Sequence, residues 1–280
     1  MLILDEYLKG LLFIASNPEM RFKAKAGLFL TCKRLSALAI LDRLKLARPR
    51  QVRAMGFTIN IDNYLDFYLM FIEIFAGRVY AFRADTPKPM IIDAGSNIGM
   101  AALYFKYLYP QASVLCFEPG PEVFSILQSN LDLNHLQDVQ AHPLALLDKD
   151  GEVTFYVPPS RPGFQGMGIF QDEQRIRTRE IKVKGARLSA FVTGPVDLLK
   201  LEVEAAEETV LKELKAAGKL GLIKQMIIEY HLHFQPGSRT LPEFLKFLNQ
   251  EGFEYLIHTE FVAAANRELP PPMLIHAIRK

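Results

Sequence analysis

Short apolar segments alternate with segments of helical spacing from residue 90 onward. The strand-like segments cover residues 90–93, 113–117, 139–145, 196–203, 223–230, 254–259 and 273–278. Helices are expected between them over residues 98–108, 122–133, 206–217 and 240–250. Such alternation is typical of parallel strands joined by right-handed crossover helices. The chain is therefore expected to form an α/β fold with a doubly wound, mostly parallel, Rossmann-like sheet.

The first strand is joined to the first helix by a turn that contains glycine. This segment reads Met90-Ile91-Ile92-Asp93-Ala94-Gly95-Ser96-Asn97-Ile98-Gly99. Gly95 allows a tight turn and lets backbone N–H groups approach a ligand, and Gly99 lets the helix pack closely on the sheet. Amides at the start of a helix favour a nearby carboxylate or phosphate. A simple strand–helix turn has the same pattern, so the segment alone leaves cofactor binding open.

A carboxylate at the end of the second strand favours cofactor binding. Glu118, followed by Pro119, lies roughly 20 residues after Gly99, the distance at which dinucleotide folds place the acid that holds ribose hydroxyls. An ionised carboxylate can accept hydrogen bonds from both the 2′- and the 3′-hydroxyl. We therefore expect an adenosine-type cofactor to be bound by seven residues: Asp93, Gly95, Ser96, Asn97, Gly99, Glu118 and Pro119.

The turn also indicates which cofactor is bound. The pyrophosphate fingerprint G-x-G-x-x-G has glycine at the position that Asp93 occupies here. A carboxylate there would repel a pyrophosphate but suits a ligand with an ammonium and a sulfonium, and S-adenosylmethionine has both. NAD is the weaker alternative. A P-loop is excluded because Lys and Ser/Thr do not follow a G-x-x-x-x-G pattern.

Four blocks of sequence together resemble a known family, the FkbM-type S-adenosylmethionine-dependent methyltransferases. The blocks are residues 92–99, Phe117-Glu118-Pro119, residues 196–204 and Ile227-Ile228-Glu229-Tyr230-His231. The resemblance covers about residues 70 to 260. It implies a class I methyltransferase fold, a seven-stranded sheet whose last strand is antiparallel. It also implies O-methylation of a hydroxyl on a sugar, a glycan or another natural-product acceptor.

One block departs from the family pattern. The family commonly reads Lys-Ile-Asp-Val-Glu-Gly-Ala-Glu where this chain reads Lys200-Leu201-Glu202-Val203-Glu204-Ala205-Ala206-Glu207. Glu202 adds a methylene at the end of the strand. Ala205 restricts the backbone where the family has glycine. These departures motivate an alternative hypothesis, a non-catalytic binding or scaffold protein with the same fold. A third hypothesis is an NAD-dependent oxidoreductase.

Candidate catalytic residues lie at the ends of two later strands. Glu202 and Glu204 end one strand, and Glu229 and His231 end the next; residues two apart on a strand share a face. His231 is the first candidate for the general base because its unperturbed pKa is near 6.5. Glu202 is expected to position the acceptor or the cofactor. Glu204 is expected to assist catalysis or to stabilise the following helix. His233, a weaker candidate, and a loop around residues 161–167 are expected near the acceptor. No metal site is predicted.

Composition and charge limit the partners. The 33 Lys and Arg residues nearly balance the 31 Asp and Glu residues, so nothing in the charge calls for nucleic acid. Two cysteines without a disulfide framework fit a cytoplasmic protein. The sequence contains no apolar run of about 18 residues that would predict a transmembrane helix.

Two domains are expected, an N-terminal helical extension over residues 1–85 and a cofactor-binding domain over residues 86–280. Residues 1–50 are helical in spacing and rich in Lys and Arg. They could cover the site, form a homo-oligomer or contact a membrane surface.

Overall fold

The computed structural model describes residues 2–18, 20, 22–46, 50–157, 179–231, 240–258 and 273–280. His233 and the loop expected around residues 161–167 lie outside these ranges. No helix in the described part of the chain is long and apolar enough to span a bilayer.

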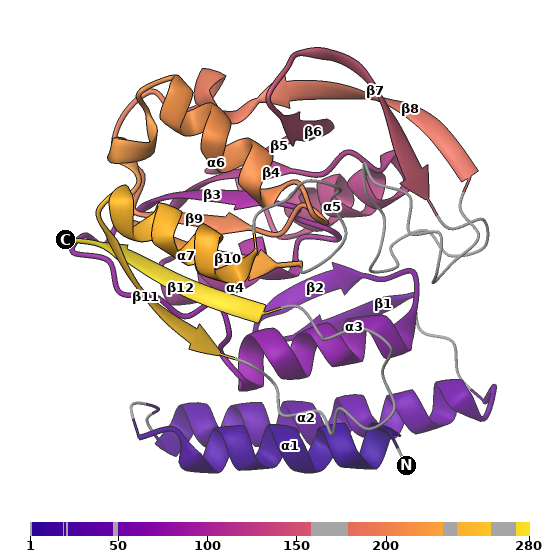
Figure 1. Cartoon of the computed structure of the whole chain (residues 1–280). Helices are drawn as coiled ribbons and strands as arrows, with labels where there is room; N and C mark the ends of the chain where they lie inside the picture. The colour runs from indigo at the N-terminus through magenta and orange to yellow at the C-terminus, as the bar shows by residue number, and fades with distance from the viewer. Residues whose placement is uncertain are drawn as a thin grey trace.

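A seven-stranded sheet forms the centre of the molecule (Figure 1). Its strands are β3 (Met90–Ala94), β4 (Ser113–Phe117), β5 (Val139–His142), β9 (Leu198–Leu201), β10 (Gln225–Tyr230), β11 (Phe253–His258) and β12 (Met273–Arg279). They lie in the order β11-β12-β10-β9-β3-β4-β5. Neighbouring strands from β10 to β5 are parallel, whereas β12 is antiparallel to both β10 and β11. The doubly wound α/β fold and the antiparallel last strand are therefore confirmed.

The order of the strands reverses between β3 and β9. From β3 the chain proceeds outward through β4 and β5, and it then returns to place β9 on the other side of β3. Adjacent loops at such a switch point leave in opposite directions and open a crevice at the carboxyl ends of the strands. This topology places the turn after β3, the end of β4 and the end of β9 around one space.

Helices cover both faces of the sheet. On one face, α4 (Met100–Leu108) and α5 (Pro121–Leu133) share a hydrophobic core with the N-terminal region. On the other face, α6 (Glu207–Ala216) and α7 (Leu241–Gln250) form a second core. Successive residues of a strand point to opposite faces, so Ile91 lies in the first core and Ile92 in the second. A capping box formed by Thr240 and Glu243 begins α7.

The N-terminal region is helical, as expected, and packs beneath the sheet. Helices α1 (Leu2–Ser16) and α2 (Phe22–Arg43) lie side by side, followed by a hairpin of β1 (Gln51–Ala54) and β2 (Phe57–Asn60). Helix α3 (Tyr64–Phe71) then continues into a π-helical turn, η1 (Ile72–Ala76). The hydrophobic core is continuous between this region and α4, so the domain boundary at residues 85 and 86 remains a prediction.

One sequence-based expectation about strands is wrong: residues 139–145 form two strands instead of one. Pro143 lacks the N–H that a continued ladder needs, so β5 ends at His142 and β6 (Leu144–Leu147) enters another sheet.

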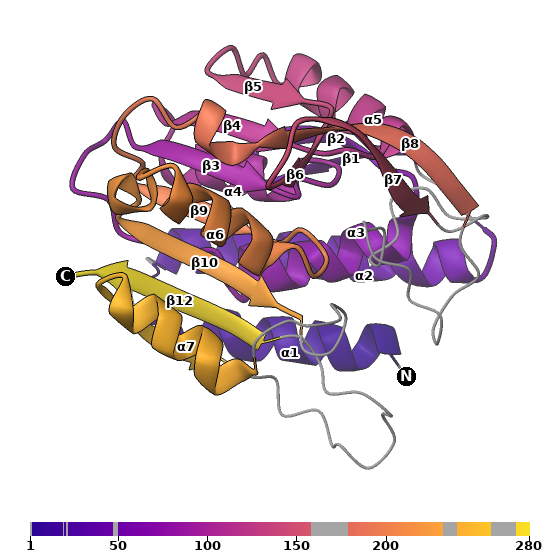
Figure 2. The ribbon, with the colours of Figure 1, turned by 45° about the horizontal axis from the view of Figure 1, so that its top comes forward.

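That other sheet has three strands, in the order β6-β8-β7, with β7 spanning Gly151–Val157 and β8 spanning Arg179–Arg187. Figure 2 shows it beside the carboxyl ends of the central strands. Residues of β6 and β7 thereby reach the switch point.

Candidate active site

The turn after β3 requires glycine because another strand end lies against it. Gly95 has a φ of +84°, and a Cβ added there would lie 1.8 Å from the carbonyl oxygen of Glu202. No side chain fits at that distance. The turn after β3 and the end of β9 are therefore in direct backbone contact, which brings Glu202 to the predicted cofactor turn.

The amides of this turn are largely satisfied by the protein itself. Gly95 and Ser96 both donate their N–H groups to the carbonyl oxygen of Phe117 at 2.9 Å. The Ser96 hydroxyl donates to the carbonyl of Asp93 at 2.8 Å and accepts from the N–H of Phe117 at 3.1 Å. Ser96 thus ties the turn to β4, and the turn is rigid before any ligand arrives.

Glu118 is held at the end of β4 by two backbone amides. Its Oε2 accepts from the N–H of Asn97 at 3.0 Å, and its Oε1 accepts from the N–H of Gly120 at 2.8 Å. The residue is only 5% exposed. Burial raises the pKa of Glu118 to about 7, although both amides and Lys200 act against this. A carboxylate has about four lone-pair positions, so two acceptor positions are left for a ligand.

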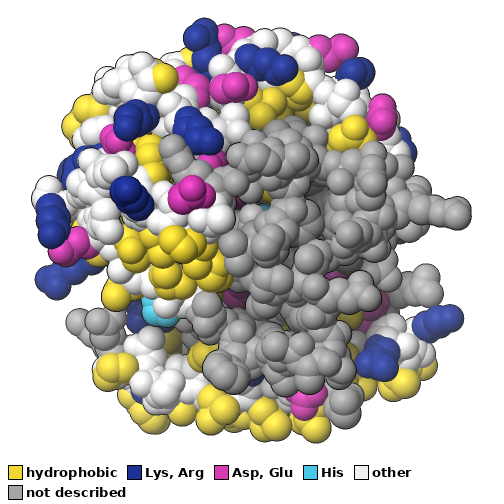
Figure 3. Space-filling view, in the orientation of Figure 1, with side chains coloured by type: hydrophobic (Ala, Val, Ile, Leu, Met, Phe, Trp, Pro, Cys, Tyr) yellow, Lys and Arg dark blue, Asp and Glu magenta, His cyan; other side chains and the backbone are white. Residues whose placement is uncertain are grey.

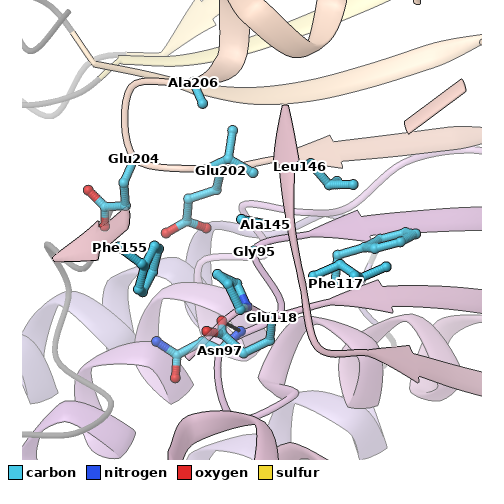
Figure 4. Close-up of a pocket in the computed structure, with 13 residues that line it drawn as sticks. Gly95, Asn97, Phe117, Glu118, Ala145, Leu146, Phe155, Glu202, Glu204 and Ala206 are labelled. Carbon is cyan, nitrogen blue, oxygen red and sulfur yellow. Dashed lines mark hydrogen bonds between the residues drawn. The ribbon is translucent and has the colours of Figure 1, made fainter. Parts of the chain in front are cut away.

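A pocket that encloses about 640 Å³, with the part open to solvent included, lies above Glu118 (Figure 4). Its lining comes from the turn after β3, the end of β4, strands β6 and β7, and the segment after β9. The lining residues are Gly95, Asn97, Phe117, Glu118, Pro119, Leu144, Ala145, Leu146, Phe155, Glu202, Val203, Glu204 and Ala206.

The structure divides the predicted cofactor residues into two groups. Four of the seven line the pocket: Gly95, Asn97, Glu118 and Pro119. Asp93, Ser96 and Gly99 are buried beside it. A Cβ on Gly99 would lie 2.8 Å from Leu127 of α5, which agrees with its expected packing role.

Asp93 faces a buried lysine instead of the pocket. It pairs in register with Lys200 of β9, and the Lys200 Nζ lies 3.3 Å from the Asp93 Oδ1. The Asp93 side chain is 0% exposed, and burial raises its pKa against the opposing effect of Lys200. Asp93 thus forms an internal ion pair in this structure, and its contact with a cationic ligand stays a prediction.

Lys200 also holds Glu202. Its Nζ lies 2.9 Å from the Glu202 Oε2 and donates to the Gly95 carbonyl at 2.6 Å. The hydroxyl of Tyr80 donates to the same Glu202 oxygen at 2.9 Å. Burial opposes ionisation of Glu202, but Lys200 and Tyr80 lower its pKa below the usual value. Glu202 is therefore a fixed anion in the pocket wall.

Sequence reasoning gave no role to Lys200 or Tyr80. A lysine inside the apolar run Leu198-Leu199-Lys200-Leu201 was an available signal, because a buried ammonium needs a partner. Tyr80 had no such signal. It lies 122 residues from Glu202, and only the folding of the chain joins them.

The other candidate catalytic residues gather around His231. Its Nδ1 lies 3.2 Å from the Glu207 Oε1, and its Nε2 lies 3.5 Å from the Glu204 Oε2 and 3.7 Å from the Glu229 Oε1. Burial disfavours the charged ring, but these carboxylates together raise the pKa of His231 to about 10. The ring is then protonated at neutral pH and has no lone pair with which to act as the expected general base.

Glu229 is the third carboxylate beside His231. Burial and the nearby Glu202 raise the pKa of Glu229 well above its usual value. Within the described ranges, no group of three or more His, Cys, Asp and Glu side chains could hold a metal ion.

The strand order, the single antiparallel strand and the pocket at the switch point together define a class I methyltransferase. A family model described as the methyltransferase FkbM domain matches residues 93–255. The chain belongs to the FkbM methyltransferase family. Membership confirms the resemblance drawn from the sequence and sets aside both the scaffold and the oxidoreductase hypotheses.

Individual relatives agree with this family. The chain is 31% identical to Methyltransferase 1 of Beauveria bassiana (strain ARSEF 2860) over 63% of this chain and 77% of that protein. It is 28% identical to the 2-O-methyltransferase NoeI of Sinorhizobium fredii (strain NBRC 101917 / NGR234) over 51% of this chain and 63% of that protein. A solved structure of a methyltransferase FkbM from Methylobacillus flagellatus KT is similar with a TM-score of 0.46 and 11% identity, covering 98% of this chain and 59% of that chain.

Proposed function

We propose that this methyltransferase uses S-adenosylmethionine to methylate a hydroxyl group of a sugar, a glycan or another natural product. The observation that carries the proposal is Glu118, a carboxylate aimed into the pocket by two amides with two acceptor positions left over. The 2′- and 3′-hydroxyls of a ribose are two donors, one for each of these acceptor positions. When bound, S-adenosylmethionine would supply a methyl group that its sulfonium has already activated.

The remainder of the pocket suits the other parts of this cofactor. Leu144, Leu146 and Phe155 offer an apolar wall for a flat base. Glu202 and Glu204 line the pocket as well, and they would attract an ammonium and a sulfonium. The same carboxylates would repel the pyrophosphate of a dinucleotide. Although Asp93 is paired internally, it contributes by holding Lys200 and, through it, Glu202.

Calorimetry with S-adenosylhomocysteine tests the ribose assignment. Because hydrogen bonds to a charged group contribute about 1.5–3 kcal/mol each, the loss of two of them in Glu118→Ala should weaken binding by about a hundredfold or more. Glu118→Gln keeps the shape of the side chain but has only one acceptor oxygen. Its affinity should lie between those of the wild type and Glu118→Ala. Glu152→Ala, an exposed carboxylate on β7, serves as the control. Unchanged affinity in Glu118→Ala would refute the assignment.

The acceptor hydroxyl needs a group that takes its proton, and we assign this role to Glu204. Glu204 lines the pocket and lies 3.5 Å from the protonated ring of His231. A relative of this chain carries the name 2-O-methyltransferase, which supports a hydroxyl acceptor. In this scheme His231 is a positioning residue that orients Glu204, and Glu202 fixes the wall beside it. A carboxylate that takes the proton of the hydroxyl during methyl transfer, as proposed for Glu204, acts as a general base.

Kinetics on Glu204→Gln and His231→Gln separate these roles. Because general base catalysis typically contributes a factor of about 10² to 10⁴, Glu204→Gln should lower kcat in that range. S-adenosylhomocysteine binding should weaken by a smaller factor, because Glu202 remains in the pocket to attract the ammonium. His231→Gln should lower kcat less and should shift the pH profile, since Glu204 then loses its cationic neighbour. A Glu204→Gln variant with full activity across a panel of hydroxyl acceptors would exclude Glu204 as the base.

A further inference from the structure

Helices α1 and α2 present an apolar outer surface. Figure 3 shows hydrophobic side chains gathered along the lower edge of the molecule, where Figure 1 draws these helices. On α1, Leu4, Leu8 and Leu12 recur every four residues and therefore share one face, and Leu12 is 70% exposed. On α2 and the segment after it, the exposed apolar residues are Phe22, Phe29, Leu30, Ile40, Leu41, Leu44 and Leu46.

The buried faces of the two helices already have partners. Leu28, Cys32, Leu35 and Ala39 of α2 lie in the core that continues into α3. Gly10 of α1 lies against Ile72 of the π-helical turn. The outer leucines are therefore a second apolar face, which the internal packing of the described chain does not use. Contiguous exposed apolar patches of this kind mark protein–protein or membrane contacts.

Charge distinguishes between these two kinds of partner. Residues 1–50 contain ten Lys and Arg and four Asp and Glu, whereas residues 51–280 contain 23 and 27. The positive excess of the chain is thus concentrated in the segment that carries the apolar surface. Exposed Lys33, Arg43 and Lys45 of this segment lie among the exposed leucines in the sequence.

A second copy of the chain fits this surface poorly. In a two-fold dimer the same patch would face itself, and the excess positive charge of each copy would repel the other. An anionic bilayer complements both properties. Leucine and phenylalanine side chains enter the boundary of the acyl chains, and Lys and Arg contact the negatively charged headgroups.

We propose that the outer surface of α1 and α2, including Leu4, Leu8, Leu12 and Leu30, docks on a membrane surface that contains anionic phospholipid. The helices would lie along the bilayer plane with the sheet domain above them. This inference rests on the N-terminal helices alone and is independent of the proposed acceptor and cofactor.

Vesicle flotation of the full chain tests the proposal. Wild-type protein should float with vesicles of phosphatidylcholine and about 30% phosphatidylserine, and at least about tenfold less with phosphatidylcholine alone. Raising the salt from about 0.1 M to about 0.5 M should weaken the binding, because it screens the charges. Equal binding to both kinds of vesicle, or no binding to either, would overturn the proposal.

Matched variants locate the contact. Leu12→Glu should reduce binding to the anionic vesicles at least about tenfold, whereas Leu256→Glu, at a comparably exposed leucine of β11, should not. Lys33→Glu should weaken binding more than Lys88→Glu, an exposed lysine outside the patch. Circular dichroism should show that all four variants are folded.

Sedimentation velocity tests the alternative that a second copy of the chain occupies this surface. A wild-type dimer that Leu12→Glu dissociates, without vesicle binding by the wild type, would assign the surface to self-association and overturn the membrane proposal.

Discussion

Glu118 combines two properties that rarely occur together in a carboxylate. It is deeply buried, which disfavours its charge, yet two amides point at it, which favours the charge. The result is a pKa of about 7, where a small change in pH alters the fraction that is ionised. A ligand that donates two hydroxyls needs the ionised form.

This pKa predicts pH-dependent cofactor binding. As pH falls through 7, Glu118 is protonated, loses an acceptor and binds ribose less well. With a pKa of about 7, the ionised fraction falls about tenfold between pH 8 and pH 6, so the dissociation constant of S-adenosylhomocysteine should rise by about that factor.

Calorimetry at both pH values measures this change in affinity. Glu118→Gln, which cannot ionise, is the control and should show a nearly flat profile. A wild-type affinity that is equal at both pH values would contradict the prediction.

Residues with local signals were predicted from the sequence, and residues defined by tertiary contacts were not. Gly95 and Glu118 belong to a strand–turn–helix pattern within about 30 residues, so their positions followed from spacing. The predicted base function of His231 depended on an unperturbed pKa. Glu229 lies two residues from His231, but Glu204 and Glu207, which also change this pKa, lie in the segment after β9, and only the folding of the chain brings them to His231.

At the scale of elements, the segment between β9 and α6 is conformationally unusual. Glu204 and Ala205 both have positive φ values, of 51° and 75°. Such a backbone is uncommon for residues with a Cβ, and it fits the glycine that the family pattern commonly has at the position of Ala205. The turn is kept in place on either side by Glu207, which accepts from the N–H groups of Val203 and Ala205.

Replacing Ala205 with glycine should therefore stabilise the protein. The left-handed region costs an L-residue with a Cβ about 1–2 kcal/mol, and the greater entropy of unfolded glycine offsets part of the gain. We expect a net increase of about 0.5–1 kcal/mol in the free energy of unfolding, measured by urea denaturation.

Ala217→Gly offers the contrast, because Ala217 has a φ of −77° at the end of α6. That variant should be neutral or destabilised. If Ala205→Gly were destabilised to the same extent as Ala217→Gly, strain at residue 205 would be ruled out.

Elements were predicted well where hydrophobic periodicity was strong. The parallel strands and their crossover helices follow from it. The division of residues 139–145 between two sheets was missed because a continuous apolar run hides which partner each half has. The aromatic rings of Tyr80 and Phe82 pack on α4, and no strand pairs with residues 79–82 in the described structure.

At the scale of the whole molecule, Asn130 of α5 and Asn134, which follows its last residue, hold the N-terminal hairpin, and Asn130 also bonds the turn after β3. The Asn130 side chain accepts from the N–H of Asn60 and donates to the carbonyls of Asn60 and Ile98. The Asn134 side chain makes the corresponding pair of bonds to Thr58. Among the described residues β2 pairs only with β1, and these side-chain amides bond backbone groups of β2 in place of a second neighbouring strand. Asn130 also connects the hairpin directly to the loop after β3.

Removing this connection should affect both stability and binding. Asn130 is completely buried, so Asn130→Ala leaves several backbone groups without partners, at a cost of about 2–4 kcal/mol in the free energy of unfolding. Because the Ile98 carbonyl loses a donor, S-adenosylhomocysteine affinity should also decrease.

Urea denaturation and calorimetry check the two effects. Gln128→Ala, on the same helix, removes only an exposed hydrogen bond to Asp132 and should change neither quantity appreciably. Wild-type stability in Asn130→Ala would show that the hairpin is held by other contacts.

The position of β12 has a consequence for the order in which the protein can be completed. This strand lies between β10 and β11, although both of them precede it in the chain. A nascent polypeptide that has emerged only as far as β11 has two strands facing a gap, each with unpaired peptide groups. Such open edges are sites of aggregation. Residues 273–279 thus complete the sheet. During synthesis, β10 and β11 each keep one unpaired edge until these residues emerge and pair with both.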